Sequence, residues 1–300
     1  MALAFELGRL SVRTTTADGV RTTRKRTHSF LAICLAMHAG SVQGQQRASL
    51  SPVNDSHEIS FQLREGYLIV VEGRIGNLSQ LKCVIDTGAT HSVVSQRIVQ
   101  KLQLPRQPGH VFKFGRYALV EWAIFPEVQI GPINVRDAKM VVDGQPSDIP
   151  ADIDAIIGLD LLARTSGFLI DYSASVISFR KASQSTALTC LTAQVMVQGH
   201  LVNLVADTGM HGFLLYDSVR QRFPHLKLKI EKTVRIGQLQ AKQVKVSGVR
   251  LGSRESEALF FLIAQPSQAI LADVDGYFGM DTLNARMIEF DFETRHLRWE

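Results

Sequence analysis

The sequence predicts an all-β protein built from two similar halves. From residue 66 onward, short runs rich in valine and isoleucine alternate with turns marked by glycine or proline. Runs of this length and composition are typical of β-strands. Helical patterns are few and short, and a set of landmarks recurs at nearly constant spacing, which indicates an internal repeat. The fold class is therefore mainly β, with few short helices.

The individual elements follow from the same patterns. Short helices are expected after each of two related motifs, over 95–104 and 217–223, and in the turns after Gly158 and Gly279. Residues 45–65 are polar and predict either a linker or a loose first strand. The clearest strands are predicted over 67–76, 81–86, 125–131, 138–144, 167–172 and 175–179.

Charge is concentrated at the front of the chain. The net charge is +5, but residues 1–44 alone carry +4, so the remaining chain is nearly neutral. No basic patch interleaved with aromatic residues is present, so the sequence does not predict a nucleic-acid partner. A hydrophobic content of 45% with 20% charged residues is that of a globular protein.

Residues 1–44 have the layout of a secretory signal peptide. A basic stretch, "RTTRKRTHS", precedes the apolar run "FLAICLAMHAGSV", which is too short to span a bilayer. We expect an exported protein, either periplasmic or secreted. An uncleaved membrane anchor and a disordered basic leader are the alternatives, and membrane association is expected only through this segment. Beyond it, Cys83 and Cys190 are either two buried thiols or a single bridge.

The tripeptide Asp-Thr-Gly occurs twice, in "VIDTGATHSVVS" at 84–95 and in "VADTGMHGFLLY" at 205–216. A glycine follows each aspartate at the same distances of 45 and 72 residues, and an aspartate follows at 74. Such agreement predicts a duplicated unit, with one copy at 66–181 and the other at 188–300. Four acids recur in both halves, and they are interpreted as turn-capping and loop-fixing residues rather than metal ligands, since no His or Cys clusters near them: Asp160, Asp281, Asp171 and Asp291.

A hydrophobic strand that ends in Asp-Thr-Gly-Ala, followed later by "IIGLDLL" and "LIDY", resembles the retropepsin-like aspartic peptidase family, and its bacterial members in particular. The resemblance covers nearly all of 66–300 and is more specific in the first half. It implies two closed-barrel lobes related by a pseudo-two-fold axis, each giving one loop to a shared active site. Viral members assemble this site as homodimers, whereas here we expect a monomer that forms an intramolecular pseudo-dimer.

The resemblance implies that Asp86 and Asp207 are the catalytic pair of an endopeptidase acting on peptides or proteins. Two carboxylates in contact cannot both ionise cheaply, so they share one proton. The ionised partner then acts as general base on a water molecule, and no metal or cofactor is expected. The loops themselves would be supported by Thr87, Gly88, Ala89, Thr208 and Gly209, and held from behind by Ile157, Gly158, Phe278 and Gly279.

A peptidase of this class also needs a hairpin that closes over the substrate. The candidates are Phe114 with Gly115 and Ile236 with Gly237, and the alternative is that both hairpins belong to the core. His91 and His211 follow the two motifs. They are either tuners of the pair's titration or, since their offsets from the aspartates differ, surface or turn residues.

Two rival hypotheses remain open at this stage. The first is a non-catalytic peptide-binding protein of the same fold, because Met210 and Gly212 occupy places where small polar residues are expected. Apolar bulk beside Asp207 raises the pKa of that carboxyl and would crowd the water. The second is an enzyme in which the first halves of two chains pair.

Overall fold

The computed structural model describes residues 45–46, 56–113, 116–144, 149–181, 190–236, 239–252, 254–264 and 274–300. In these ranges the chain is mainly β, as predicted. The expected signal peptide at 1–44 and most of the joint between the halves lie outside the described residues. None of the helices in the described part is long and apolar enough to cross a membrane.

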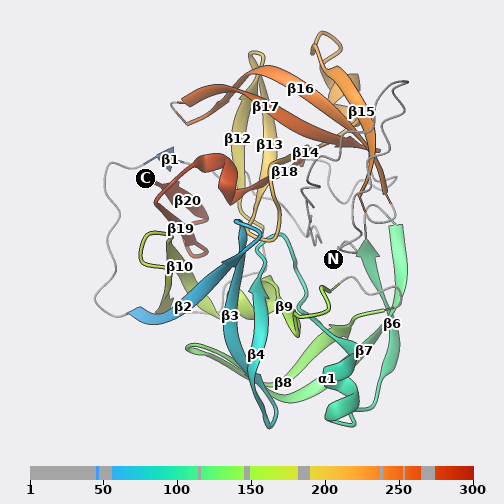
Figure 1. Cartoon of the computed structure of the whole chain (residues 1–300), viewed down its shortest axis with the longest axis vertical. Helices are drawn as coiled ribbons and strands as arrows, with labels where there is room; N and C mark the ends of the chain where they lie inside the picture. The colour runs from blue at the N-terminus through green and yellow to red at the C-terminus, as the bar shows by residue number, and fades with distance from the viewer. Residues whose placement is uncertain are drawn as a thin grey trace, which may run out of the picture.

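Strands of the N-terminal half pair in a closed ring, in the lower part of Figure 1. β7 pairs both with β8 and with β3, which closes the ring, and β6 (Gln107–Lys113) extends β7 as a hairpin. The order round the ring is β3 (Leu68–Ile75), β4 (Leu78–Ile85), β9 (Ala155–Ile157), β5 (Val93–Val94), β8 (Ile133–Val142) and β7 (Arg116–Ile130).

The C-terminal half repeats this ring in the same order, in the upper part of Figure 1. β16 pairs with β17 and again with β12, and β15 (Lys229–Ile236) extends β16 as a hairpin. Two closed-barrel lobes are therefore present. The order is β12 (Thr192–Val197), β13 (His200–Asp207), β18 (Gly276–Gly279), β14 (Phe213–Tyr216), β17 (Arg254–Ile263) and β16 (Leu239–Leu251).

A separate stretch of sheet joins the two halves, at the left of Figure 1. β10 of the first half pairs antiparallel with β19 of the second, and the rings of Phe168 and Phe290, which are register partners, stack at 4.9 Å. Buried aromatic pairs of this kind stabilise a sheet beyond their area alone. The strands run in the order β1 (Gln45–Gln46), β20 (His296–Trp299), β19 (Met287–Asp291), β10 (Thr165–Asp171), β11 (Val176–Lys181) and β2 (Ser56–Arg64).

Ion pairs cross the same joining sheet. Arg180 on β11 contacts Glu289 at 3.1 Å and Asp291 at 3.5 Å, and Arg298 contacts the same two carboxylates at 2.9 and 3.3 Å. All four side chains are at most 20% exposed, so solvent screens this network less than a surface pair. The network ties the first half to the second.

Residues 56–64 form a full strand rather than a linker. β2 pairs with β11 through its first five residues and with β3 through its last four. Its polar residues face outward, while Phe61 is buried and meets the edge of Tyr172 at 5.9 Å. The polar composition does not indicate a strand, but pairing with β11 and β3 makes this segment one.

The short helices lie where the sequence predicts them. α1 (Gln96–Lys101) and α3 (Ser218–Arg222) follow the two motifs. α2 (Leu159–Leu162) follows Gly158, and the 3₁₀ helix η2 (Met280–Leu283) follows Gly279. Each is at most six residues long, too short to be stable alone, so packing against the barrels must hold it.

Candidate active site

Each Asp-Thr-Gly loop begins where a central strand ends. Asp86 follows β4 and Asp207 is the last residue of β13. A parallel strand lies beside each one: Ile85 pairs with Ile157, and Asp207 with Gly279. The backbone N–H of Asp86 donates to the carbonyl oxygen of Ile157 at 3.0 Å. Buried hydrogen-bonded strands therefore fix the start of both loops.

The two loops bind each other through their threonines. The hydroxyl of Thr208 accepts from the N–H of Thr87 at 3.0 Å and donates to the carbonyl of Ile85 at 2.8 Å. The hydroxyl of Thr87 accepts from the N–H of Thr208 at 3.1 Å and donates to the carbonyl of Ala206 at 2.8 Å. Four buried hydrogen bonds thus join segments about 120 residues apart.

The glycines allow the two carboxyl groups to approach. A Cβ atom built on Gly88 would lie 2.8 Å from Oδ1 of Asp207, and one built on Gly209 would lie 2.6 Å from Cγ of Asp86. Each aspartate therefore lies against the glycine of the opposite loop, and any side chain there would displace it. Both aspartates are fully buried.

Hydrogen bonding differs between the two carboxyl groups. Oδ1 of Asp86 accepts from the N–H groups of Gly88 at 3.0 Å and Ala89 at 2.9 Å, whereas Oδ1 of Asp207 accepts from that of Gly209 at 2.8 Å. The Oδ2 atoms of both are buried and accept no hydrogen bond from the loops' backbone. The backbone thus stabilises the anionic form of Asp86 more than that of Asp207.

The pKa values of both carboxyls are raised. Burial is the largest cause for Asp86, and its backbone hydrogen bonds oppose it. Burial is also the largest cause for Asp207, whose pKa is raised further by the charge of Asp86. Both carboxyls therefore hold a proton more readily than an exposed aspartate does.

The segments predicted to support the loops from behind do contact them. The N–H of Leu159, the residue after Gly158, donates to the carbonyl of Ala89 at 2.7 Å. In the second half the N–H of Gly279 donates to the carbonyl of Gly212 at 2.7 Å. Phe278 on β18 pairs with Ala206 and is fully buried, as Ile157 is.

Two of the repeated acids fix the loops and two cap hairpin turns. Asp160 accepts from the N–H of Ser92 at 2.9 Å, and Asp281 accepts from that of Gly212 at 3.0 Å. Asp171 and Asp291 accept backbone N–H groups two or three residues ahead in their own hairpin turns. In the described ranges no group of three or more His, Cys, Asp or Glu side chains is arranged to hold a metal.

A second repeated acid escaped the sequence analysis. Asp154 accepts from the N–H of Lys82 at 2.9 Å and pairs with Arg97 of α1 at 2.9 Å. Asp275 accepts from the N–H of Asn203 at 2.8 Å and pairs with an arginine of α3, Arg222. Both acids lie 68 residues after their Asp-Thr-Gly aspartate, so the signal was present in the spacing. Each ties a helix to the strand behind its loop.

Replacing Asp275 with alanine is expected to lower the free energy of unfolding by about 2–4 kcal/mol, because a buried N–H and an arginine lose their acceptor. Urea denaturation at pH 7 measures this. The control is Glu257→Ala, which breaks the exposed Lys245–Glu257 pair and should leave the free energy of unfolding nearly unchanged. Equal losses in the two variants would contradict a structural role for Asp275.

Apolar side chains from both halves surround the loops. One buried cluster contains Ala89 and Met210, the residues that follow the two Asp-Thr-Gly tripeptides, together with Tyr67, Tyr216 and Tyr277. Met210 is 1% exposed. Its side chain is therefore part of the apolar packing that the two loops share.

The candidate flap residues are only partly described. Phe114, Gly115 and Gly237 lie outside the described residues, and Ile236 ends β15. The stems of both hairpins are present, and Trp122 of β7 and Val234 of β15 belong to the apolar cluster that contains Ala89 and Met210. The stems thus pack beside the loops, and the flap function stays a prediction.

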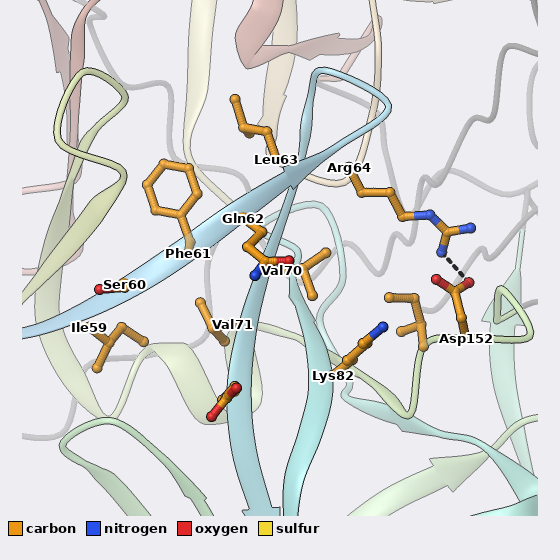
Figure 2. A pocket seen from close by; sticks show the side chains of 12 residues that line it. Ile59, Ser60, Phe61, Gln62, Leu63, Arg64, Val70, Val71, Lys82 and Asp152 are labelled. Carbon is orange, nitrogen blue, oxygen red and sulfur yellow. Dashed lines mark ion pairs between the residues drawn. The ribbon is translucent and has the colours of Figure 1, made fainter.

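A pocket of about 810 Å³ lies along β2, β3 and β4. Figure 2 shows its lining, with the ion pair between Arg64 and Asp152, at 2.6 Å, on one side. Lys82 and Glu72 add one charge of each sign. Neither Asp86 nor Asp207 lines this pocket, so it is not the site of the paired carboxyls.

The two cysteines beyond the leader do not form a bridge: Cys83 and Cys190 are free thiols.

Closed six-stranded rings with paired, buried Asp-Thr-Gly aspartates define an aspartic-peptidase type of fold. Residues 71–164 match the family described as gag-polyprotein putative aspartyl protease. This match supports the resemblance of the first half of the chain to the retropepsin-like aspartic peptidase family. A crystal structure of a retropepsin-like aspartic protease from Rickettsia conorii is 21% identical, over 44% of this chain and 97% of that one, with a TM-score of 0.32. No curated protein matches the sequence.

Proposed function

We propose that the protein is a single-chain aspartic endopeptidase in which Asp86 and Asp207 together activate a water molecule. The observation that carries the proposal is the arrangement of the two buried carboxyls, each against the glycine of the opposite loop. A structural pair of turn aspartates has no need of this arrangement, since burying two acids side by side is costly. Perturbed pKa values in such a pair point to function.

The two aspartates take different roles in this mechanism. Asp86 has the better-stabilised anion, because two backbone N–H groups donate to it. It acts as general base and removes a proton from the water that attacks the peptide carbonyl. Asp207 holds the shared proton and donates a hydrogen bond to the carbonyl oxygen, which stabilises the tetrahedral intermediate.

Each half supplies one aspartate, so the proposed active species is a monomer. The threonine hydrogen bonds join loops of the same chain and support this form over one that pairs the first halves of two chains. We also propose that the protein is exported through the leader at residues 1–44. The two units, 66–181 and 188–300, are proposed to have arisen by duplication. The substrates are peptides or proteins.

The activity is expected to extend to weakly acidic or neutral pH. The reactive form carries one proton on the pair, and the raised pKa values of both carboxyls move this form to higher pH. Cleavage of a mixed peptide library by the purified monomer, followed by mass spectrometry from pH 3 to pH 8, measures it. Peptides that bind but stay intact over this range would support a binding protein instead.

The same pKa shifts predict how stability changes with pH. A carboxyl whose pKa is higher in the folded state stabilises the fold most below about pH 4, and this contribution is lost as the pH rises through the folded value. The melting temperature should therefore fall by several degrees from pH 4 to pH 8. Asp207→Asn, which carries no charge, should remove much of this fall in differential scanning calorimetry, and an unchanged slope would contradict the shared proton.

A further inference from the structure

The two active-site loops are tied to the segment behind them by different chemistry. In the first half, Asp160 accepts from both the N–H and the hydroxyl of Ser92, at 2.9 and 2.6 Å. The hydroxyl of Ser92 also accepts from the N–H of Gly158 at 3.0 Å. A serine hydroxyl does not titrate, so on the donor side these bonds do not change with pH.

The second loop has no hydroxyl at this place, since Gly212 stands there. Asp281 still accepts from the backbone N–H of Gly212 at 3.0 Å. The second donor is His211, whose Nδ1 lies 2.9 Å from Oδ2 of Asp281. The side chains of His211 and Asp281 are 41% and 22% exposed, so the contact is half-buried. A titratable imidazole thus occupies the role of the Ser92 hydroxyl.

His211 also touches the first half. The ring of Tyr67, in the turn between β2 and β3, lies 5.4 Å from the imidazole at an angle of 42°. Tyr67 is 7% exposed and interacts electrostatically with four charged groups, those of Glu65, Asp207, Asp281 and Arg64. His211 is therefore held between a carboxylate of its own lobe and an aromatic ring of the other lobe.

We propose that protonated His211 is a positioning residue that fixes the second Asp-Thr-Gly loop against Asp281 and Tyr67, so that the geometry of the aspartate pair depends on pH. The proposal rests on the proposed peptidase function. An imidazolium donates a stronger hydrogen bond to a carboxylate than a neutral ring does, and it is attracted to the face of an aromatic ring. In the first loop the corresponding donor, the hydroxyl of Ser92, carries no charge at any pH.

The electrostatics agree with this role. The hydrogen bond to Asp281 raises the pKa of His211, and this effect exceeds the opposing effect of burial. A raised pKa means that the tie is fully present below the ordinary histidine value of about 6.5 and is lost as the pH rises through the higher folded value. His91 behaves oppositely: burial against Trp122 lowers its pKa to about 4.

The first test does not need catalysis. In an Asp86→Asn background, NMR titration of the full chain should give His211 a pKa above 6.5, and a further Asp281→Asn change should lower it to the ordinary value or below, because burial then acts alone. The resonance is assigned by its absence in His211→Gln. A His211 that titrates at or below 6.5 overturns the proposal, whether or not the protein is a peptidase.

The second test separates positioning from mere stability. His211→Phe keeps a ring beside Tyr67 but donates no hydrogen bond, and kcat should fall about fivefold at pH 5, with KM unchanged within twofold. The difference should shrink as the pH rises through the folded pKa of His211, which lies above the ordinary histidine value. His211→Gln, a neutral donor, should recover only part of kcat, to the same extent at every pH, while His91→Gln should leave the pH dependence in place. A kcat reduced equally at all pH values would contradict the proposal.

Discussion

An Asp207→Asn protein is expected to lose about a thousandfold or more in kcat/KM for peptide cleavage, because asparagine can neither share the proton of the pair nor pass it on. Asp86→Asn should lose as much, since each role needs the other and the effects of residues that act as a unit do not add. The double variant should therefore be no worse than either single one. Initial rates on one cleaved library peptide measure all three.

Asn is nearly the same size as Asp, so these variants should keep the fold. Their far-ultraviolet circular dichroism and melting temperature at pH 4 should match the wild type, where burial favours the neutral carboxyl in any case. Asp217→Asn, a half-buried aspartate outside the two loops that pairs with Arg220, is the matched control and should retain activity. Full activity in Asp207→Asn would refute the shared pair, and a loss only in Asp86→Asn would favour pairing of first halves between two chains.

Thr208→Val is expected to lower the free energy of unfolding by about 2–5 kcal/mol. The change keeps the shape of the side chain but leaves the N–H of Thr87 and the carbonyl of Ile85 buried without their partner. Each such group costs about 1–3 kcal/mol. Activity should fall further than stability suggests, since the same bonds hold the two aspartates in register. Chemical denaturation and kcat, measured on the same preparation, check both effects.

Thr208→Ser supplies the matched control, because it retains the hydroxyl and loses a methyl group. It should recover most of the stability and most of kcat. A serine variant as impaired as the valine variant would show that packing of the methyl group, rather than the exchanged hydrogen bonds, holds the loops together.

Much of the fold could be predicted from the sequence because its signals are local. Strand composition and glycine turns mark the barrels, and the equal spacings to Gly158 and Gly279 place a supporting strand behind each loop. The duplication as an origin of the two halves stays a prediction, although the two rings share one strand order. The sequence left β2 ambiguous because its side chains are mostly polar. Pairing with β11 and β3, which are distant or separated by a turn, makes it a strand.

The site was predictable only in outline. The aspartates and threonines could be named from the motif, but their contacts join residues about 120 positions apart, which no local pattern encodes. Asp154 and Asp275 showed the same spacing and were still missed, because their arginine partners lie at different offsets. The contact between His211 and Asp281 depends on the one-residue difference between the two loops and needed coordinates.

Covalent connection of the two lobes has a consequence for how the site can evolve and operate. In a symmetric dimer, every loop residue is present twice, so both aspartates must have identical surroundings until substrate binds. Here Ala89 follows the first Asp-Thr-Gly and Met210 the second, so the two loops already differ and each can change alone. The tether also makes assembly of the site independent of protein concentration. In the proposed mechanism, the sequence of each loop can therefore fix which aspartate is the base and which is the acid, whereas in a symmetric dimer only substrate binding distinguishes them.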